Sequence, residues 1–333
     1  MKTTEVYVAN LCVPCNAHCR YCLLSWDGRV KGIEYERGKN FVRGFYKWLK
    51  DNKPDLDFNT YQGYCMDYKE LQDAIRFARE TGSVGSEFLQ FNGMKLRSDV
   101  EIEELIKMVK SEGVKLIDLT FYGIGEYHDK FAGRSGDFDL NMSILNAALK
   151  NVLKVKVGLP VTQENMEQVD ELIDEMEKYE LDSISVWLPH DLGRGKTLTG
   201  IRMTKKDYEV LPDHVKKYMN MKKYKTPAEW KAAAKDIRPQ SRVLNLGLTK
   251  DNIDRLEHMT YEEIYHSLEK MDDEYYKVVP TFQELLDLYC DDTSGKLYRA
   301  DDLYRQYQER YKREKKLDIY DMNDQRQTFS IRY

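Results

Sequence analysis

The sequence lacks the features that mark membrane, secreted or low-complexity chains. None of its apolar runs approaches the ~18 residues that a membrane-spanning helix requires. Residues 1–5 lead directly into a strand-like segment instead of the apolar core of a signal peptide. Low-complexity stretches are also missing, as are repeats other than an alternation of strand-like and helix-like segments. We therefore expect a soluble, cytoplasmic protein.

The sequence also has no excess of positive charge. Its 52 Lys and Arg residues are outnumbered by 57 Asp and Glu residues, which gives a net charge of −5. Binding of duplex nucleic acid relies on basic surfaces, so we expect no nucleic acid partner. With 41% hydrophobic and 33% charged residues, the composition is that of a globular chain. A length of 333 residues corresponds to about two domains or to one large α/β barrel.

Cysteine is scarce over most of the chain, and this scarcity makes its clustering informative. Four of the six cysteines lie between Cys12 and Cys22, and only Cys290 lies beyond Cys65. In a reducing cytosol, clustered cysteines are more often metal ligands or catalytic thiols than disulfides. The cluster is therefore the first candidate for a functional site.

Two alternating hydrophobic periods predict repeated βα units in the first two-thirds of the chain. Segments rich in β-branched and aromatic residues predict strands at 5–11, 56–61, 88–91, 115–121, 154–160 and 183–188. Amphipathic spacing predicts helices at 40–51, 68–80, 100–111, 140–149 and 166–179. Asp99 is a candidate N-cap for the third of these helices. Such units build a parallel sheet, open or curled into a complete or partial barrel, with functional groups in loops at the C-terminal strand ends.

After about residue 200 the pattern changes to charged, Tyr-rich helical segments. Helices are predicted at 206–219, 227–236, 261–269, 281–289 and 300–315, and one possible strand at 242–248. We predict two domains: a barrel formed by residues 1–200, and a helical cap or substrate domain formed by residues 201–333.

The cysteine cluster directly follows the first predicted strand. Only three residues separate Cys15 from Cys19, whereas zinc knuckles are a dozen or more residues apart, so a four-thiolate zinc site is possible but strained. Cys15, Cys19 and Cys22 can instead each bind one iron of a [4Fe–4S] cube and leave the fourth iron open. Open coordination is typical of a catalytic metal site. Cys12 is then a packing residue, because a fourth thiolate would close that iron.

The Cys-x3-Cys-x2-Cys spacing, with Tyr21 directly before the last cysteine, resembles the signature of the radical SAM superfamily. The resemblance extends over about residues 5–200 and implies a partial (β/α)6 TIM-like barrel, here with a mostly helical C-terminal extension. In such enzymes S-adenosylmethionine (SAM) chelates the open iron, and its reductive cleavage yields methionine and a 5′-deoxyadenosyl radical that abstracts hydrogen from the substrate. The resemblance thus implies an enzyme with a [4Fe–4S] cluster, SAM and an external reductant such as flavodoxin or ferredoxin.

The resemblance also implies residues that contact SAM. Gln62 and Gly63 follow the second strand, where many members carry a Gly-Gly-Glu-Pro motif that holds the methionine amino group. Tyr64, Cys65 and Met66 replace its last three residues, so Gln62 would offer a side-chain oxygen and Gly63 its backbone. An ordinary turn at the strand end is the alternative.

Further strand ends belong to the same resemblance, in which Tyr21 is also a cofactor-binding position. Asn92 is expected near the SAM pocket, and Thr120 takes the place of a serine beside the SAM ribose or carboxylate. Arg134 could pair with that carboxylate, since a guanidinium fork suits a planar anion, and Leu159 could pack on the adenine. The alternative is a turn residue for Asn92, a strand residue for Thr120, a surface residue for Arg134 and a core residue for Leu159.

The resemblance is to members that modify peptides, because Thr120 and His128-Asp129 lie in a segment similar to theirs. A peptide or natural-product precursor is therefore the first expectation for the substrate, and a sugar, nucleoside or amino acid is the alternative. The cysteine-rich extension that holds auxiliary clusters in such members is missing, so Cys65 or Cys290 could act as hydrogen donors, as in similar radical epimerases. A buried hydrophobic role is the alternative for both. A non-catalytic metal-binding or docking protein also stays open.

Overall fold

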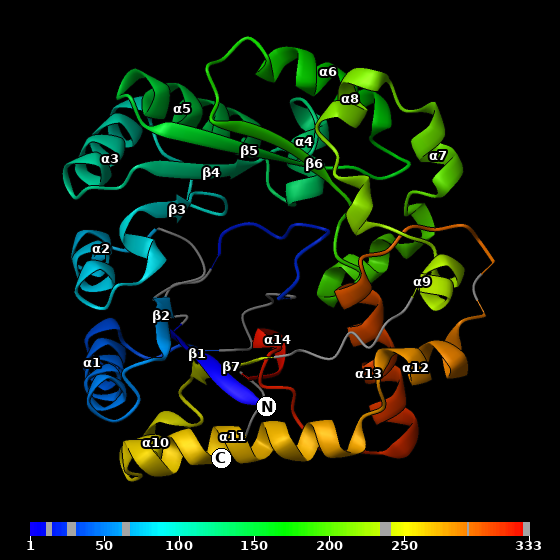
Figure 1. Cartoon of the computed structure of the whole chain (residues 1–333). Coiled ribbons are helices and arrows are strands. Elements are labelled where there is room, and N and C mark those ends of the chain that lie inside the picture. Colours follow the sequence, from blue (N-terminus) through cyan, green and yellow to red (C-terminus); the bar gives the residue numbers. More distant parts are fainter. Residues whose placement is uncertain (11–14, 25–30, 62–66, 234–240, 292, 329–333) are drawn as a thin grey trace.

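A computed structural model describes residues 1–10, 15–24, 31–61, 67–233, 241–291 and 293–328. Within these residues the chain forms an α/β fold in which parallel strands curve around a central space and helices cover their outer face (Figure 1). The strands are β1 Lys2–Asn10, β2 Asp57–Tyr61, β3 Phe88–Gln90, β4 Leu116–Thr120, β5 Lys154–Pro160, β6 Ser183–Trp187 and β7 Ser241–Leu248. All six predicted strands are present within a few residues of their expected bounds, and β7 confirms the possible seventh.

The helices follow the strands in regular alternation up to β6 and then dominate the remainder of the chain. The first part contains α1 Tyr35–Asn52, α2 Leu71–Glu80, η1 Val84–Ser86, α3 Asp99–Ser111, α4 Glu126–Ala132, α5 Asp137–Lys150 and α6 Met166–Met176. The second part contains η2 Gly193–Ile201, α7 Lys205–Val210, α8 Asp213–Lys217, η3 Met221–Lys223, α9 Pro227–Ala233, α10 Ile253–Glu257, α11 Tyr261–Val278, α12 Phe282–Tyr289, α13 Ala300–Lys315 and α14 Gln325–Thr328. The predicted helical C-terminal extension is therefore confirmed.

The strands form two parallel sheets with the orders β7-β1-β2 and β3-β4-β5-β6. In the first sheet Tyr7 is paired with Asn59 of β2 on one side and with Asn245 of β7 on the other. The C-terminal part of the chain thus supplies a strand next to the first one. Division into domains at residue 200 stays a prediction, and β7 shows that the sheet itself crosses that boundary.

Alternation along the strands sends apolar side chains outward to the helices and leaves a polar inner face. Val155, Val157 and Leu159 are buried in the core cluster that β5 shares with α5 and α6. The residues between them, Lys156 and Gly158, point to the opposite face because successive side chains of a strand alternate. The inner face therefore offers room and polar groups for a site.

Two local details differ from the sequence expectation. The N-cap of α3 is Ser98, whose hydroxyl and Glu101 form a capping box, so the expected cap at Asp99 is wrong by one residue. The predicted helix at 206–219 is split into α7 and α8 around Pro212, because proline has no amide hydrogen for a helical bond.

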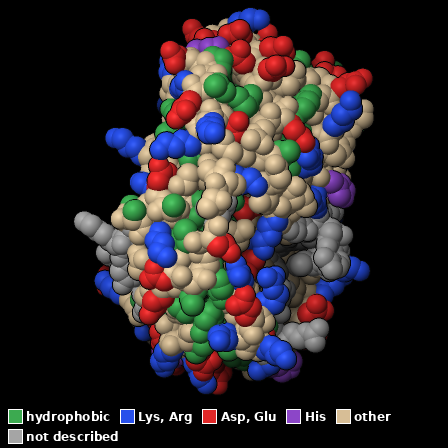
Figure 2. Space-filling model, turned by 90° about the vertical axis from the view of Figure 1, so that its right-hand side faces the viewer, with side chains coloured by type: hydrophobic (Ala, Val, Ile, Leu, Met, Phe, Trp, Pro, Cys, Tyr) green, Lys and Arg blue, Asp and Glu red, His purple; other side chains and the backbone are tan. Residues whose placement is uncertain are grey.

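The outer surface mixes charges of both signs. On the face that carries α7, α9 and α13, Lys and Arg side chains are interspersed with Asp and Glu (Figure 2). Among the helices that the structure describes, none combines the length and apolar character needed to cross a bilayer.

Candidate active site

The described part of the cysteine loop, residues 15–24, lies inside the curve of the sheets (Figure 1). Backbone hydrogen bonds attach it to the chain that follows β3 and to the end of α4. The amide of Asn16 donates to the Gly93 carbonyl at 2.8 Å, and the amide of His18 donates to the Ala132 carbonyl at 2.8 Å. The loop position is thus fixed by the C-terminal side of the barrel, where parallel βα folds place their sites.

The loop is closed from a third side by the chain that follows β6. The amide of Arg194 donates to the Cys22 carbonyl at 2.9 Å, and its Nη1 donates to the Cys19 carbonyl at 3.2 Å. Gly193 has φ +56°, and a Cβ there would lie 2.1 Å from the Leu23 carbonyl oxygen. Only glycine permits this close approach, so the Gly193-Arg194 pair clamps the segment that holds the last two cysteines.

Three cysteines in this loop fit a cluster rather than a single ion. Cys15, Cys19 and Cys22 are half-buried, none forms a disulfide, and their charges are close enough to affect one another. Among the described residues, no three His, Cys, Asp or Glu side chains are arranged to hold one metal ion. A [4Fe–4S] cube has different requirements, because each thiolate binds a different iron. The donor set therefore fits three corners of a cube, with no fourth thiol in the described part of the loop.

Two of the cysteines, Cys15 and Cys19, have thiols whose pKa is changed by burial. Burial raises the pKa of the Cys19 thiol to about 12 and also raises the pKa of Cys15. The hydroxyl of Tyr122 donates to the Cys19 sulfur at 3.4 Å, a contact that stabilises negative charge on that sulfur. Iron binding must therefore displace protons from buried thiols.

Tyr21 connects the cysteine loop to the ends of β4 and β6. Its ring lies 5.2 Å from the ring of Tyr122 and 5.4 Å, edge-on, from the ring of Trp187. Its hydroxyl is hydrogen-bonded to Tyr122 and Thr120, and desolvation raises the pKa of Tyr21 above its ordinary value. The predicted cofactor positions Tyr21 and Thr120 are therefore brought together, although their contact with SAM stays a prediction.

A buried charged network lies behind Tyr122. His128 is completely buried; its Nδ1 accepts from the Tyr122 amide at 3.2 Å, and its Nε2 lies 3.0 Å from Asp137 Oδ2. Arg134 donates to the other oxygen of Asp137 and to the Met94 carbonyl. Burial opposes the charge of Asp137, but these hydrogen bonds outweigh it and hold the pKa of that carboxyl below its usual range. The His128 partner is thus Asp137 rather than its neighbour Asp129.

This network bears on the prediction that Arg134 binds the SAM carboxylate. Both Nη atoms of Arg134 are engaged within the protein, whereas its Nε is a buried donor without a partner among the described residues. One donor is therefore left for another group, and the role of Arg134 toward SAM stays a prediction.

Asn92 and Leu159 have structural partners of their own. Asn92 donates to the Thr120 carbonyl at 3.0 Å and accepts from the Thr120 amide at 2.9 Å, which ties the ends of β3 and β4 together. Leu159 is fully buried in the core cluster, so contact with adenine would require it to leave that cluster. Both predicted contacts with SAM remain untested.

Other predicted site residues are not brought to the loop or lie outside the described residues. Gln62, Gly63 and Cys65, as well as Cys12, belong to the second group. Cys290 ends α12 and packs with Trp230 and other residues of the C-terminal helices, in a different cluster from Cys19. Its predicted role as a hydrogen donor is not tested by this placement.

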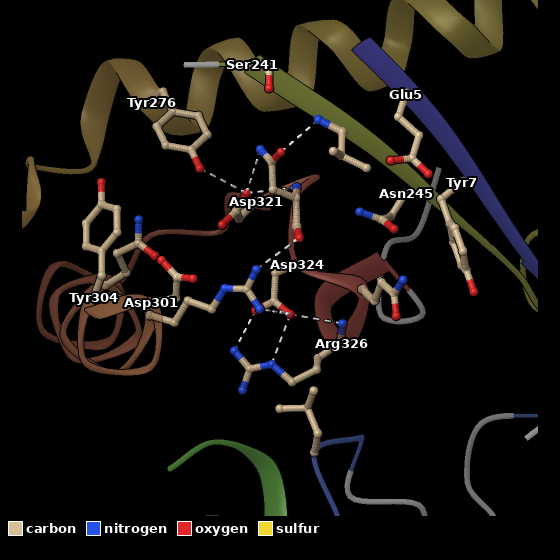
Figure 3. Close-up of a pocket in the computed structure, with 16 residues that line it drawn as sticks. Glu5, Tyr7, Ser241, Asn245, Tyr276, Asp301, Tyr304, Asp321, Asp324 and Arg326 are labelled. Carbon is tan, nitrogen blue, oxygen red and sulfur yellow. Dashed lines mark hydrogen bonds and ion pairs between the residues drawn. The ribbon is translucent and has the colours of Figure 1, made fainter. Parts of the chain in front are cut away.

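A cavity of about 730 Å³ extends from the cysteine loop along the inner face of β1 and β7 (Figure 3). Glu5 and Tyr7 line it from β1, and Asn245 lines it from β7. Leu23, which directly follows Cys22, also lines it. The polar inner face of the barrel is therefore accessible next to the cluster motif, at a volume typical of small-molecule sites.

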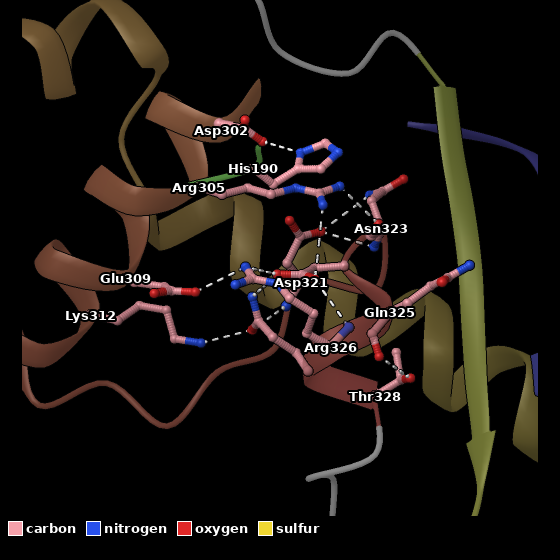
Figure 4. A network of polar contacts seen from close by, with 12 residues as sticks. His190, Asp302, Arg305, Glu309, Lys312, Asp321, Asn323, Gln325, Arg326 and Thr328 are labelled. Carbon is pink, nitrogen blue, oxygen red and sulfur yellow. Dashed lines mark hydrogen bonds and ion pairs between the residues drawn. The ribbon is translucent and has the colours of Figure 1, made fainter. Parts of the chain in front are cut away.

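The C-terminal segment closes this cavity through a dense polar network (Figure 4). Asp324 accepts from Arg326 Nε at 2.9 Å, and Arg326 Nη2 reaches Glu309 of α13 at 2.9 Å. Asp321 accepts from the Asn323 amide at 2.9 Å and from the Tyr276 hydroxyl at 3.3 Å. Burial, followed by the nearby Asp324 carboxylate, raises the pKa of Asp321 to about 6. Sequence analysis missed this network, because residues 321–326 form no recognised motif and their partners Glu309 and Tyr276 lie on other helices.

Comparisons with known proteins agree with this architecture. No model of a known protein family matches the sequence. The Fe-coproporphyrin III synthase of Methanosarcina barkeri (strain Fusaro / DSM 804) is 25% identical over 198 residues, which cover 58% of this chain and 46% of that protein. The chain therefore matches less than half the length of this relative.

Solved structures share the fold at low sequence identity. Streptococcus suis SuiB bound to S-adenosylmethionine is 12% identical with a TM-score of 0.50, and the match covers 74% of this chain and 58% of that one. Coproporphyrinogen III oxidase from Escherichia coli, a radical SAM enzyme, is 10% identical with a TM-score of 0.48 and coverages of 92% and 90%. The cysteine motif after the first strand and the parallel sheets are those that the resemblance to radical SAM enzymes implies, and the chain is similar over 198 residues to one curated protein.

Proposed function

We propose that this chain is an enzyme that cleaves SAM reductively to a 5′-deoxyadenosyl radical and uses the radical to abstract hydrogen from an organic substrate. The observation that carries the proposal is the clamped loop, which presents Cys15, Cys19 and Cys22 at the C-terminal side of the barrel. These three thiolates would hold a [4Fe–4S] cluster. Such a cluster supplies an electron to SAM when both are bound.

The chain's own residues position and shield this site. Arg194 and the carbonyls of Gly93 and Ala132 form hydrogen bonds that hold the backbone of the loop in place. Tyr122 donates to the Cys19 sulfur and thereby lowers its negative charge density. The aromatic group around Tyr21 covers one side of the loop and excludes water from it.

The substrate is proposed at the level of class. The first candidate is a peptide or natural-product precursor. It is based on the similarity of the segment around Thr120 and His128 to the same segment of peptide-modifying members. A small metabolite is the second candidate, and the cavity beside the loop favours it because its volume suits a small molecule. A flavodoxin or ferredoxin is the proposed reductant, and the cytoplasm is the proposed location.

The decisive experiment is anaerobic reconstitution of the full chain with iron and sulfide. We expect about four irons per chain, acid-labile sulfide in similar amount, and 5′-deoxyadenosine from SAM after reduction, measured by mass spectrometry. Zinc without sulfide would instead favour the non-catalytic docking protein. Transfer of deuterium from a labelled candidate substrate into 5′-deoxyadenosine then identifies the substrate.

A further inference from the structure

A second cavity of about 730 Å³ lies at the carboxyl end of β6. Trp187 of β6, Tyr224 and Trp230 form aromatic walls, and Arg299 lines it just before α13. Trp187 also contacts Tyr21 edge-on, with ring centroids 5.4 Å apart. Trp187 therefore connects this cavity to Tyr21 of the cysteine loop, which places the cavity within reach of a substrate that reacts there.

Arg299 contributes a positive charge whose hydrogen-bond partners are an imidazole ring and a phenol hydroxyl. Its Nη2 donates to the Tyr224 hydroxyl at 3.0 Å, and its Nη1 lies 2.7 Å from His190 Nε2. The nearest carboxylate oxygen, Asp302 Oδ2, is 3.9 Å away, and the other oxygen of Asp302 is bound to His190 Nδ1 at 2.7 Å (Figure 4). The guanidinium is thus positioned by its neighbours without a carboxylate at hydrogen-bond distance.

More cationic than anionic side chains line this cavity, and Asp302 lies outside the lining. Lys223 and Arg299 line it together with a single carboxylate, that of Asp301. Two cationic side chains and one carboxylate therefore line the cavity, an arrangement that matches one carboxylate better than a phosphate dianion. The aromatic walls also support the guanidinium, which lies 5.4 Å from the Tyr224 ring centroid and 5.8 Å from that of Trp187.

The first cavity has the opposite character. Glu5, Asp301 and the C-terminal carboxylates line it, and its arginines, Arg305 and Arg326, already contact Asp324. Because Asp301 lines both cavities, they adjoin at the start of α13. An anion is therefore directed to the β6 side and away from β1 and β7.

We propose that the cavity walled by Trp187, Tyr224 and Trp230 binds the carboxylate-bearing, aromatic or otherwise planar part of the substrate, with Arg299 as the anion partner. This inference rests on the proposed function, because it assumes that the cavity serves the reaction at the cysteine loop. It narrows the substrate to a molecule with a free carboxylate on an apolar, planar group.

Calorimetric titration of the reconstituted full chain tests the proposal with three probes of one shape: 2-naphthoate, 2-naphthamide and 2-naphthyl phosphate. We expect 2-naphthoate to bind at least about tenfold more tightly than the neutral amide. The amide cannot form the charge-assisted hydrogen bond to Arg299, and the loss of such a bond weakens binding by about this factor. Arg299→Gln should remove about this tenfold preference, while Arg299→Lys should keep part of it because the charge remains. Lys223→Gln, at an exposed position, should weaken 2-naphthoate binding only about two- to threefold.

Arg310→Gln is the matched control. Arg310 lies on α13, pairs with Glu314 at 3.0 Å and does not line this cavity, so the same change there should leave binding unaltered. Equal binding of naphthoate and amide, or a preference that survives Arg299→Gln, would overturn the proposal. Tighter binding of 2-naphthyl phosphate would overturn the carboxylate assignment in favour of a phosphate ligand.

The two proposals fail separately. Absence of 5′-deoxyadenosine despite selective naphthoate binding would reject the enzymatic function and leave an anion site. Normal 5′-deoxyadenosine formation without selective binding would reject only the anion site.

Discussion

The two halves of the barrel bury similar charged groups for different purposes. On the β3–β6 side, Asp137 pairs with His128 and Arg134 behind the residues that hold the cysteine loop. On the β7-β1-β2 side, Asp324 pairs with Arg326 and lies 3.9 Å from Arg305, where the C-terminal segment closes a cavity. Both carboxylates are almost completely buried. The comparison separates electrostatic groups that support the cofactor loop from those that support the wall of the barrel.

The largest expected effect is on the cofactor loop itself. Cys19→Ala removes one of three iron ligands, so the iron content should fall far below four per chain and 5′-deoxyadenosine should fall to background. Cys290→Ala, a cysteine change on the other side of the molecule, should keep the iron content of the unchanged protein. Iron assay and mass spectrometry measure both, and full 5′-deoxyadenosine formation by the Cys19 variant would refute the cluster assignment.

The comparison is sharpened by matched substitutions of the two buried carboxylates. Asp137→Asn should lower the free energy of unfolding by about 3 to 5 kcal/mol, because it leaves the buried Arg134 without its counter-charge. Asp324→Asn should lower it by less, because Arg326 keeps its ion pair with Glu309. Only Asp137→Asn should also lower the iron content after reconstitution, since α4 and Tyr122 form hydrogen bonds with that network. Urea unfolding and iron assay together test this, and equal iron loss in both variants would contradict the separation.

A smaller, pH-dependent effect is expected from Asp321. Its carboxyl has a pKa of about 6 in the folded chain against an ordinary value of 3.8, so the folded state binds more protons between these pH values. The free energy of unfolding should therefore fall as pH rises from about 4 to 6 and then level off, by on the order of 2–3 kcal/mol. Asp321→Asn should lack this component. Unfolding curves that keep the same pH slope in both proteins would argue against the raised pKa.

The smallest effect is expected for an exposed ion pair on the loop. Arg20 and Glu164 are 2.9 Å apart and each is more than a third exposed. Glu164→Gln should change the free energy of unfolding by less than about 1 kcal/mol, and less still in high salt. Iron content should stay unchanged, because backbone bonds rather than this pair hold the loop. A marked loss of iron would show that the side chain anchors the loop as well.

The sequence predicted the features that depend on local patterns. Strands such as β5 and the motif at Cys15, Cys19 and Cys22 follow from alternation and spacing, which neighbouring residues determine. Contacts made across the fold could not be predicted in this way. Nothing in the order of residues shows that Arg134 is engaged by Asp137, or that Leu159 faces the helices.

The cavity beside β6 illustrates the same limit. His190 follows β6 closely in the sequence, but Arg299 lies more than a hundred residues further along and has no motif of its own. Tertiary packing alone brings the two together. Neither the spacing nor the periodicity of the sequence indicates which residues of the C-terminal helices lie beside this cavity.

The position of β7 has a consequence for the folding of the newly synthesised chain. Lys2 on the first strand is paired with Ser241, so this edge of β1 remains uncovered until most of the chain has left the ribosome. Pairing over such a sequence distance is slow, and an open strand edge invites contact with other chains. Nascent molecules should therefore depend on holding factors or on low temperature during production, and insertion of iron belongs after β7 has docked.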